Sequence, residues 1–159
     1  MTLQKELGLD LPFEDLRHEA VLSIVRTASM LANGGADIFR QHDLTEAQFN
    51  VLLALKYKDR TLTQSDLGQR LVITRASVTS VLDKLEAKKL VERRNVPGNR
   101  RIFHVELTPK GQDLVEKVEP VYRETVHRVL ASFSDKDCRA LTALLERVRA
   151  GAHKVFGTQ

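Results

Sequence analysis

The sequence predicts a mainly α-helical fold with one small β-hairpin. Two observations carry this prediction. Apolar residues recur with a spacing of three and four along most of the chain, which is the pattern of amphipathic helices. Strict alternation occurs in one place, where Phe103, Val105 and Leu107 are separated by polar residues, as in a half-buried strand. Pro97-Gly98 is a turn signal just before that strand, so a hairpin is expected there.

Composition is that of a soluble globular protein. The chain has 159 residues, enough for one domain with a sizeable core, and 42% are hydrophobic and 29% charged. Cys138 is the only cysteine, which excludes an intramolecular disulfide and favours a reducing cytoplasm. No stretch approaches an uncharged membrane helix, and the first residues lack a signal-peptide pattern, so we expect no membrane partner.

Positive charge is concentrated in one segment. Between positions 70 and 101 the sequence holds nine Lys and Arg residues against three acids, a net charge of +6. Because the whole chain carries +4, the remainder carries −2. A polyanion would therefore be attracted to this segment and not to the surface as a whole.

The N-terminal part is expected to hold an arm and one long helix. Residues 1–12 have weak periodicity and are predicted to form a flexible N-terminal arm. A helical pattern covers residues 13–42 and is apolar on more than one side, so this helix needs more than one packing partner. Asn33-Gly34-Gly35 is expected to kink or loosen it.

The central segment, residues 43–107, begins with a helix start in which Thr45 and Gln48 have the pattern of a capping box. A second capping pattern, at positions 63–66, opens a short helix, and Thr74 is expected to cap the helix that follows. Two short helices joined by a few residues predict a helix-turn-helix.

The helix at residues 74–88 has two different faces. Its apolar stripe is formed by Val78, Val81, Leu82 and Leu85. The opposite side carries small or hydrogen-bonding side chains, with Arg75 and Ser77 at its flanks: Ala76, Thr79, Ser80 and Asp83. Such side chains allow close approach and can meet base edges or phosphates. Taken alone, an ordinary core helix rich in Ser and Thr explains the pattern equally well.

The hairpin that follows has a basic tip, formed by Arg93, Arg94, Arg100 and Arg101. Such a wing is placed to lie on the DNA backbone or to enter the minor groove, where arginine is favoured. The alternative is a solvated hairpin whose arginines only maintain solubility.

Residues 108–159 return to long apolar-striped helices. Thr108 and Pro109 have the pattern of a helix start, Pro120 is expected to kink that helix, and Ser134 is expected to cap the last one. The terminal helices, residues 13–42 and 108–159, are expected to be dimerisation helices, because they carry more apolar residues than a small winged domain could cover. A two-fold dimer would place two helices for successive major grooves of a near-palindromic site. A monomer whose helices pack only on themselves is the alternative.

Three runs, at positions 62–71, 78–94 and 99–111, resemble the MarR (multiple-antibiotic-resistance regulator) family. The last run resembles its Asp-x-Arg wing signature and Leu-Thr-x-x-Gly ending, which makes Arg101 the wing arginine and puts Asn99 at the family's aspartate. The family's usual glycine before Leu-Val is here Lys89, so another residue is expected to take the left-handed turn at that helix end.

The resemblance implies a homodimeric, ligand- or redox-responsive transcriptional regulator, more often a repressor. In this family, effectors commonly bind between the dimerisation helices and the winged domain. We therefore expect double-stranded DNA, a second copy of the chain and a small-molecule effector as partners. The residues predicted to contact DNA are Gln64 and Ser65 for phosphates, Arg75, Ser77, Thr79 and Ser80 for the major groove, and Arg94, Arg100 and Arg101 in the wing.

No catalytic or metal-binding pattern stands out. The five histidines include no His-x-x-x-His pair and no His-Glu-x-x-His, so we expect neither an enzyme, nor a metal site, nor a cofactor. Cys138 lies in the first turn of the last predicted helix and is interpreted as a packed residue, with an oxidant sensor as the alternative. The rival function is a protein-interaction winged helix that uses its basic face on an acidic partner.

Overall fold

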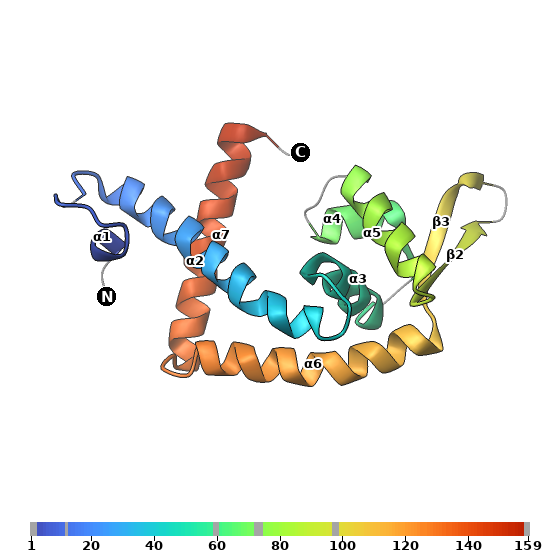
Figure 1. The fold of residues 1–159 in the computed structure, drawn as a ribbon. Helices are drawn as coiled ribbons and strands as arrows, with labels where there is room; N and C mark the ends of the chain where they lie inside the picture. The colour runs from blue at the N-terminus through green and yellow to red at the C-terminus, as the bar shows by residue number, and fades with distance from the viewer. Residues whose placement is uncertain (1–2, 12, 59–60, 72–74, 97–98, 158–159) are drawn as a thin grey trace. The chain divides into compact units, whose positions relative to one another are not determined.

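The computed structural model describes residues 3–11, 13–58, 61–71, 75–96 and 99–157, apart from six side chains, those of Arg75, Ala76, Val96, Asn99, Arg100 and Arg101. The chain divides into two compact units, residues 1–122 and 123–159. Within the described residues the predicted fold class is confirmed, because helices dominate and a β-hairpin follows a helix-turn-helix (Figure 1).

The first unit holds most of the elements. In chain order they are α1 (Leu3–Glu6), α2 (Leu16–Arg40), α3 (Glu46–Lys56), β1 (Leu62–Thr63), α4 (Gln64–Leu71), α5 (Arg75–Ala87), β2 (Val91–Val96), β3 (Asn99–Leu107) and most of α6 (Pro109–Val129). The second unit holds the end of α6 and α7 (Asp135–Phe156). No helix in the described parts of the chain is long and apolar enough to span a bilayer.

Helix α2 begins three residues later than its apolar pattern predicts. Asp15 is the cause, because its carboxylate accepts a hydrogen bond from the backbone N–H of Arg17 at 2.8 Å and so caps the helix. Phe13 precedes the helix and meets the ring of His18 edge-on, with centroids 6.1 Å apart. Gly34 and Gly35 lie inside continuous helix, so the loosened turn expected there does not form.

The predicted helix starts are present where the structure describes them. Thr45 and Gln48 exchange both hydrogen bonds of a capping box, at 3.0 and 3.2 Å. Asp66 and Thr63 form the same arrangement before α4. Thr108 caps α6 by accepting the N–H of Gly111 at 3.0 Å. Thr74, the predicted cap of α5, lies outside the described residues.

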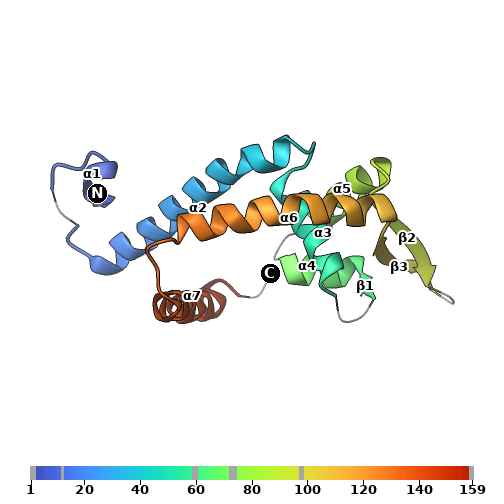
Figure 2. The ribbon, with the colours of Figure 1, turned by 90° about the horizontal axis from the view of Figure 1, so that it is seen from below.

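Helix α3 is the centre of the core of the first unit. It lies beside the end of α2 and close to α4 and α5 (Figure 1, Figure 2). Phe49 and Leu52 of α3 are fully buried, as are Val78, Leu82 and Leu85 of α5. Each such side chain contributes roughly 1.5–3 kcal/mol on burial. The stripe predicted for α5 is therefore its buried face, with Val81 at the edge of the core.

A polar contact ties α3 to α6. Glu119 of α6 is 7% exposed and accepts hydrogen bonds from Lys56 Nζ at 2.7 Å and from Tyr57 Oη at 2.5 Å. Hydrogen bonding to Glu119 raises the pKa of the Lys56 ammonium above its ordinary value. The buried carboxylate is thus paired, as burial of a charge requires.

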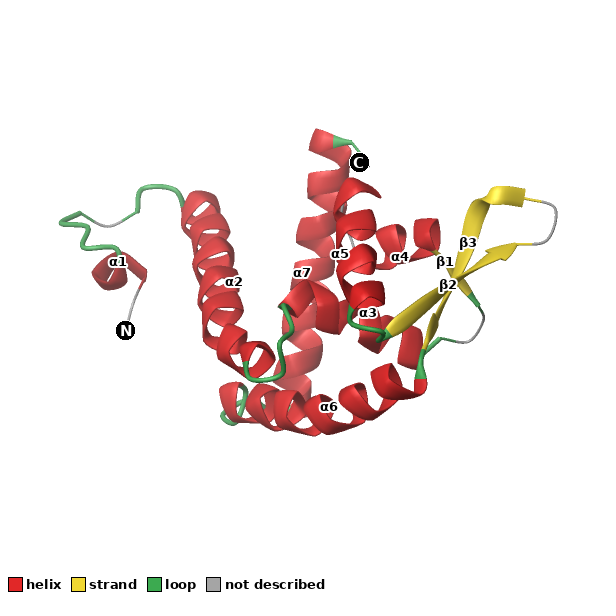
Figure 3. Cartoon of the chain, turned by 45° about the vertical axis from the view of Figure 1, so that its right-hand side comes forward, coloured by secondary structure: helices red, strands yellow, loops and turns green. Residues whose placement is uncertain are grey.

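The sheet has three antiparallel strands in the order β1-β3-β2, shown in yellow in Figure 3. Leu62 of β1 pairs with Val105 of β3, and Arg93 of β2 pairs with the same residue from the other side. The hairpin of β2 and β3 is the one expected from the sequence, and β1 adds a third strand beside it. Pairing to β1 covers one edge of β3 and anchors the hairpin on the helices.

Lys89 takes the left-handed turn at the end of α5 itself, with φ 58°. Leu90 N donates to Leu85 O at 2.9 Å and Lys89 N donates to Glu86 O at 2.8 Å, which is a Schellman motif. The expectation that another residue would take this conformation is therefore wrong. The geometry of the turn is imposed by Leu90 and Val91, which are both buried beyond it.

Replacing Lys89 by glycine should stabilise the protein, because glycine adopts a positive φ without the steric cost that a side chain imposes. We expect the free energy of unfolding in urea to rise by roughly 1 kcal/mol. Lys89→Ala is the matched control, since it removes the same side chain and keeps the strained backbone. Equal stability of the two variants, at one protein concentration, would show that φ at this position carries no strain.

Candidate nucleic-acid interface

Helices α4 and α5 form the predicted helix-turn-helix, and the polar side of α5 is accessible. Ser77, Ser80 and Asp83 are exposed, and Thr79 is half-buried. On the opposite side Val78, Leu82 and Leu85 are fully buried in the core, and Val81 is partly buried. The side chain of Arg75, the first residue of α5, lies outside the described portion of the chain. Six of the predicted contact residues thus belong to the two adjacent helices of one motif: Gln64 and Ser65 on α4, and Arg75, Ser77, Thr79 and Ser80 on α5.

Two of the predicted contact residues touch each other. Gln64, the first residue of α4, donates a hydrogen bond from its side-chain amide to the hydroxyl oxygen of Thr79 on α5. This contact fixes the Thr79 side chain on the accessible face. Ser65, the next residue of α4, is exposed beside it. The start of α4 therefore contacts α5 through Gln64 and offers its own polar groups.

In the wing, Arg94 is exposed and is held by acidic neighbours on the sheet. Its Nε lies 3.1 Å from Glu92 Oε1 and 3.5 Å from Glu106 Oε2. Hydrogen bonding to Glu92 raises the pKa of the Arg94 guanidinium above its ordinary value. Arg100 and Arg101 are the second and third residues of β3, and their side chains lie outside the part that the structure describes.

Arg93 differs from the other wing arginines in its surroundings. Its guanidinium pairs with Asp83 and lies 3.5 Å, Nε to Oε2, from Glu86, both on α5. Only 16% of its side chain is exposed. Sequence reasoning placed Arg93 at the basic tip with Arg94 and did not foresee this contact. The alternation of side chains along β2 could have predicted a covered Arg93, because Arg93 lies on the same strand face as the buried Val91.

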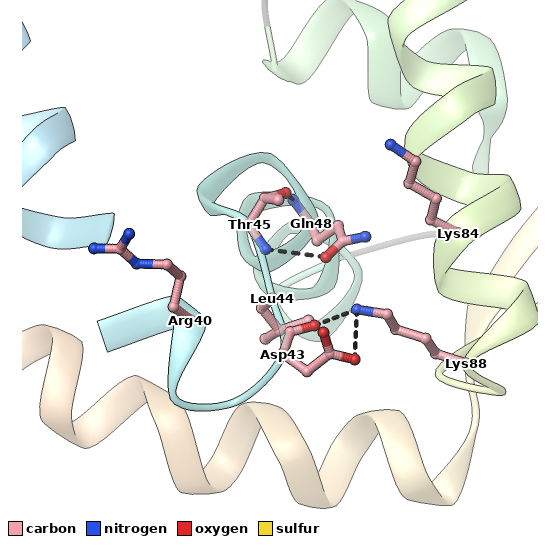
Figure 4. Close-up of a pocket in the computed structure, with 7 residues that line it drawn as sticks. All are labelled: Arg40, Asp43, Leu44, Thr45, Gln48, Lys84 and Lys88. Atoms are coloured by element: carbon pink, nitrogen blue, oxygen red, sulfur yellow. Dashed lines mark hydrogen bonds and ion pairs between the residues drawn. The ribbon is translucent and has the colours of Figure 1, made fainter. Parts of the chain in front are cut away.

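A cavity of about 370 Å³ lies on the other flank of α5, lined by Arg40, Asp43, Leu44, Thr45, Gln48, Lys84 and Lys88 (Figure 4). Lys88 Nζ is 3.0 Å from Asp43 Oδ2 and also donates to the Asp43 backbone carbonyl. Gln48 is 3% exposed and uses its side-chain oxygen in the capping box. Apart from the Asp43 carboxylate, the charged groups around this cavity are cations.

No group of three or more His, Cys, Asp or Glu residues that could hold a metal occurs within the described ranges. Cys138 is half-buried and unbonded to another cysteine. The described residues combine a helix with a small-residue face, a hydrogen-bonded helix before it and a basic hairpin after it. This arrangement defines a winged helix-turn-helix protein.

Comparison with known proteins gives the family. Residues 42–102 match the model of the MarR family. The HTH-type transcriptional regulator MhqR of Bacillus subtilis (strain 168) is 31% identical over 113 residues, which cover 70% of this chain and 77% of MhqR. The homoprotocatechuate degradative operon repressor of Escherichia coli is 30% identical over 109 residues, covering 69% of this chain and 73% of that protein.

The chain also resembles a solved structure of BpsR from Bordetella bronchiseptica, with a TM-score of 0.68 and 29% sequence identity. DNA binding by BpsR is regulated by 6-hydroxynicotinic acid. The match covers 82% of this chain and 98% of BpsR. The chain belongs to the MarR family of transcriptional regulators. The resemblance predicted from the helix-turn-helix and wing sequences is confirmed, and these relatives are regulators and not enzymes.

Proposed function

We propose that the protein is a homodimeric, sequence-specific DNA-binding regulator that acts as a repressor and is released by a small-molecule effector. The observation that carries the proposal is the division of α5 into a fully buried apolar face and an accessible face of small polar residues. An accessible helix face of this kind fits the major groove, where base edges are distinguishable. The E. coli relative named as a repressor supports the direction of regulation.

The proposed contact residues divide by position. Gln64 and Ser65 would hold phosphates at the start of α4, and Arg75, Ser77, Thr79 and Ser80 would approach base edges from α5. Arg94, Arg100 and Arg101 would serve the wing on the backbone or in the minor groove. In this division α5 recognises the base sequence, and α4 and the wing hold the protein on the DNA.

Exposed apolar residues on the terminal helices support a two-fold dimer built by residues 13–42 and 108–159. On α2, Val21 and Val25 are 54% and 59% exposed, and on α7 Leu144 and Val148 are 55% and 46% exposed. Exposed apolar side chains at positions i and i+4 of one helix, as on each of these two, usually meet another protein surface. Residues 43–107 would then be the DNA-binding domain and residues 1–12 an arm. A regulator of this kind works in the cytoplasm.

An effector site is supported by the cavity beside α5. Lys84, Lys88 and the Gln48 amide are donors suited to a carboxylate, and Leu44 offers an apolar wall. An aromatic acid such as 6-hydroxynicotinic acid, which regulates DNA binding by BpsR, has the matching chemistry. The carboxylate would compete with Asp43 for Lys88 and so change the setting of α5.

Sequence-specific binding separates this proposal from the rival, a protein-interaction module with an acidic partner. Salt weakens both complexes, but only DNA reading predicts that unrelated duplexes bind orders of magnitude more weakly than the cognate one. The test is a gel-shift series with the DNA flanking the protein's own gene. Equal affinity for all duplexes would favour the rival.

Arg101→Ala should weaken operator binding and reduce the slope of log K against log salt by about two per dimer, because each of the two protomers loses one phosphate contact. Arg149→Ala is the matched control, since it removes the same charge from an exposed position of α7. We expect the control to keep the slope of the unmodified protein. An unchanged slope in Arg101→Ala would remove this arginine from the interface.

6-Hydroxynicotinic acid should dissociate the complex with operator DNA, and Lys84→Ala should require a several-fold higher concentration of the acid for the same effect. Lys117→Ala, an exposed position on α6, is the control and should respond as the unmodified protein does. Gel shifts at graded acid concentrations measure both. If Lys84→Ala responds like the control, the cavity is not the effector site.

A further inference from the structure

We propose that Arg93 is a positioning residue that fixes the wing on the recognition helix α5 and makes no contact with DNA itself. The inference rests on the proposed function for its consequence in DNA binding, but the contact exists in the protein alone. It separates Arg93 from Arg94, its neighbour in the same basic run, which is 64% exposed on the opposite face of β2.

The direction of the Arg93 side chain follows from the register of the sheet. Arg93 lies opposite Val105 of β3, which is fully buried, and two residues after Val91, which is also buried. Side chains alternate between the two faces of a strand, so Arg93 points to the covered face while Arg94 points to solvent. A charged side chain on the covered face needs an acidic partner.

Helix α5 supplies two such partners. Asp83 and Glu86 are three positions apart, so they lie on the same flank of the helix. Arg93 pairs with Asp83 through Nη2, and its Nε lies 3.5 Å from Glu86 Oε2. Nε is buried and has no hydrogen-bond partner among the described residues, so its carboxylate contact is ionic. One planar guanidinium thus bridges two carboxylates of one helix.

Two consequences follow for reading DNA. The wing and α5 meet a duplex in a fixed mutual orientation, because their link spans the end of the helix and the first half of β2. The Arg93 charge also neutralises Asp83, which is exposed on the polar side of α5, where an unpaired carboxylate would repel phosphates. Since the charge is already paired, Arg93 releases few counterions on binding.

The first test needs no DNA. Amide hydrogen exchange should become faster in β2 and β3 of Arg93→Ala, while the amides of α3 keep the exchange of the unmodified protein. Arg93→Lys should restore only part of the protection, because an ammonium is a single point charge and cannot bridge both carboxylates in one plane. Arg94→Ala, the matched control, should change the exchange of the hairpin far less, because its ion pairs with Glu92 and Glu106 are exposed to solvent. Unchanged exchange in Arg93→Ala would overturn the proposal.

The second test uses the operator duplex. Arg93→Ala should lower affinity by roughly threefold to tenfold at every salt concentration without changing the salt slope, as expected for loss of an ion pair that orients the site. Adding Glu86→Gln to Arg93→Ala should cause little further loss, since both changes break one contact. A slope reduced by about two per dimer would instead make Arg93 a phosphate ligand. If the unmodified protein shows no preference for its operator, the proposed function fails, and the exchange result still decides the role of Arg93.

Discussion

Val78, Leu82 and Leu85 of α5 are completely buried against the core that α3 provides, and this burial decides what the rest of the molecule can present. The three side chains together contribute several kcal/mol, at roughly 1.5–3 kcal/mol each. Rotation of α5 about its axis would expose them, so the helix has one stable orientation. Its small polar residues therefore always face outward, and a surface suited to a duplex exists before any duplex is bound.

The flanks of α5 are held by two different parts of the first unit. On one flank Arg93 bridges Asp83 and Glu86 and so joins the helix to the wing. On the other, Lys88 contacts Asp43 in the connection between α2 and α3, beside the cavity. A bound ligand or a substitution at either flank therefore acts on α5, which moves as one rigid helix. Under the proposed function, this placement would connect an effector bound in the cavity to the DNA-facing side of α5.

Local features of the fold were predictable from the sequence, and contacts across the chain were not. The capping boxes at Thr45 and Ser134 and the buried stripe of α5 depend on neighbours within one turn or one helix, so spacing alone reveals them. Lys89 was misjudged because the buried residues beyond it outweigh its steric cost. The Arg93 bridge joins positions on different elements, which spacing cannot show. All nine predicted DNA contacts remain predictions, and for Arg75, Arg100 and Arg101 the side chains also lie outside the described residues.

The central claim is that two copies of α5, each held by its buried face, present their polar faces to one duplex. Hydroxyl-radical footprinting of the operator complex tests this claim most directly. The account predicts two protected segments on each strand, centred about one helical turn, roughly 10 base pairs, apart and related by two-fold symmetry. A single protected segment would contradict it. So would protection that is the same on operator and unrelated DNA.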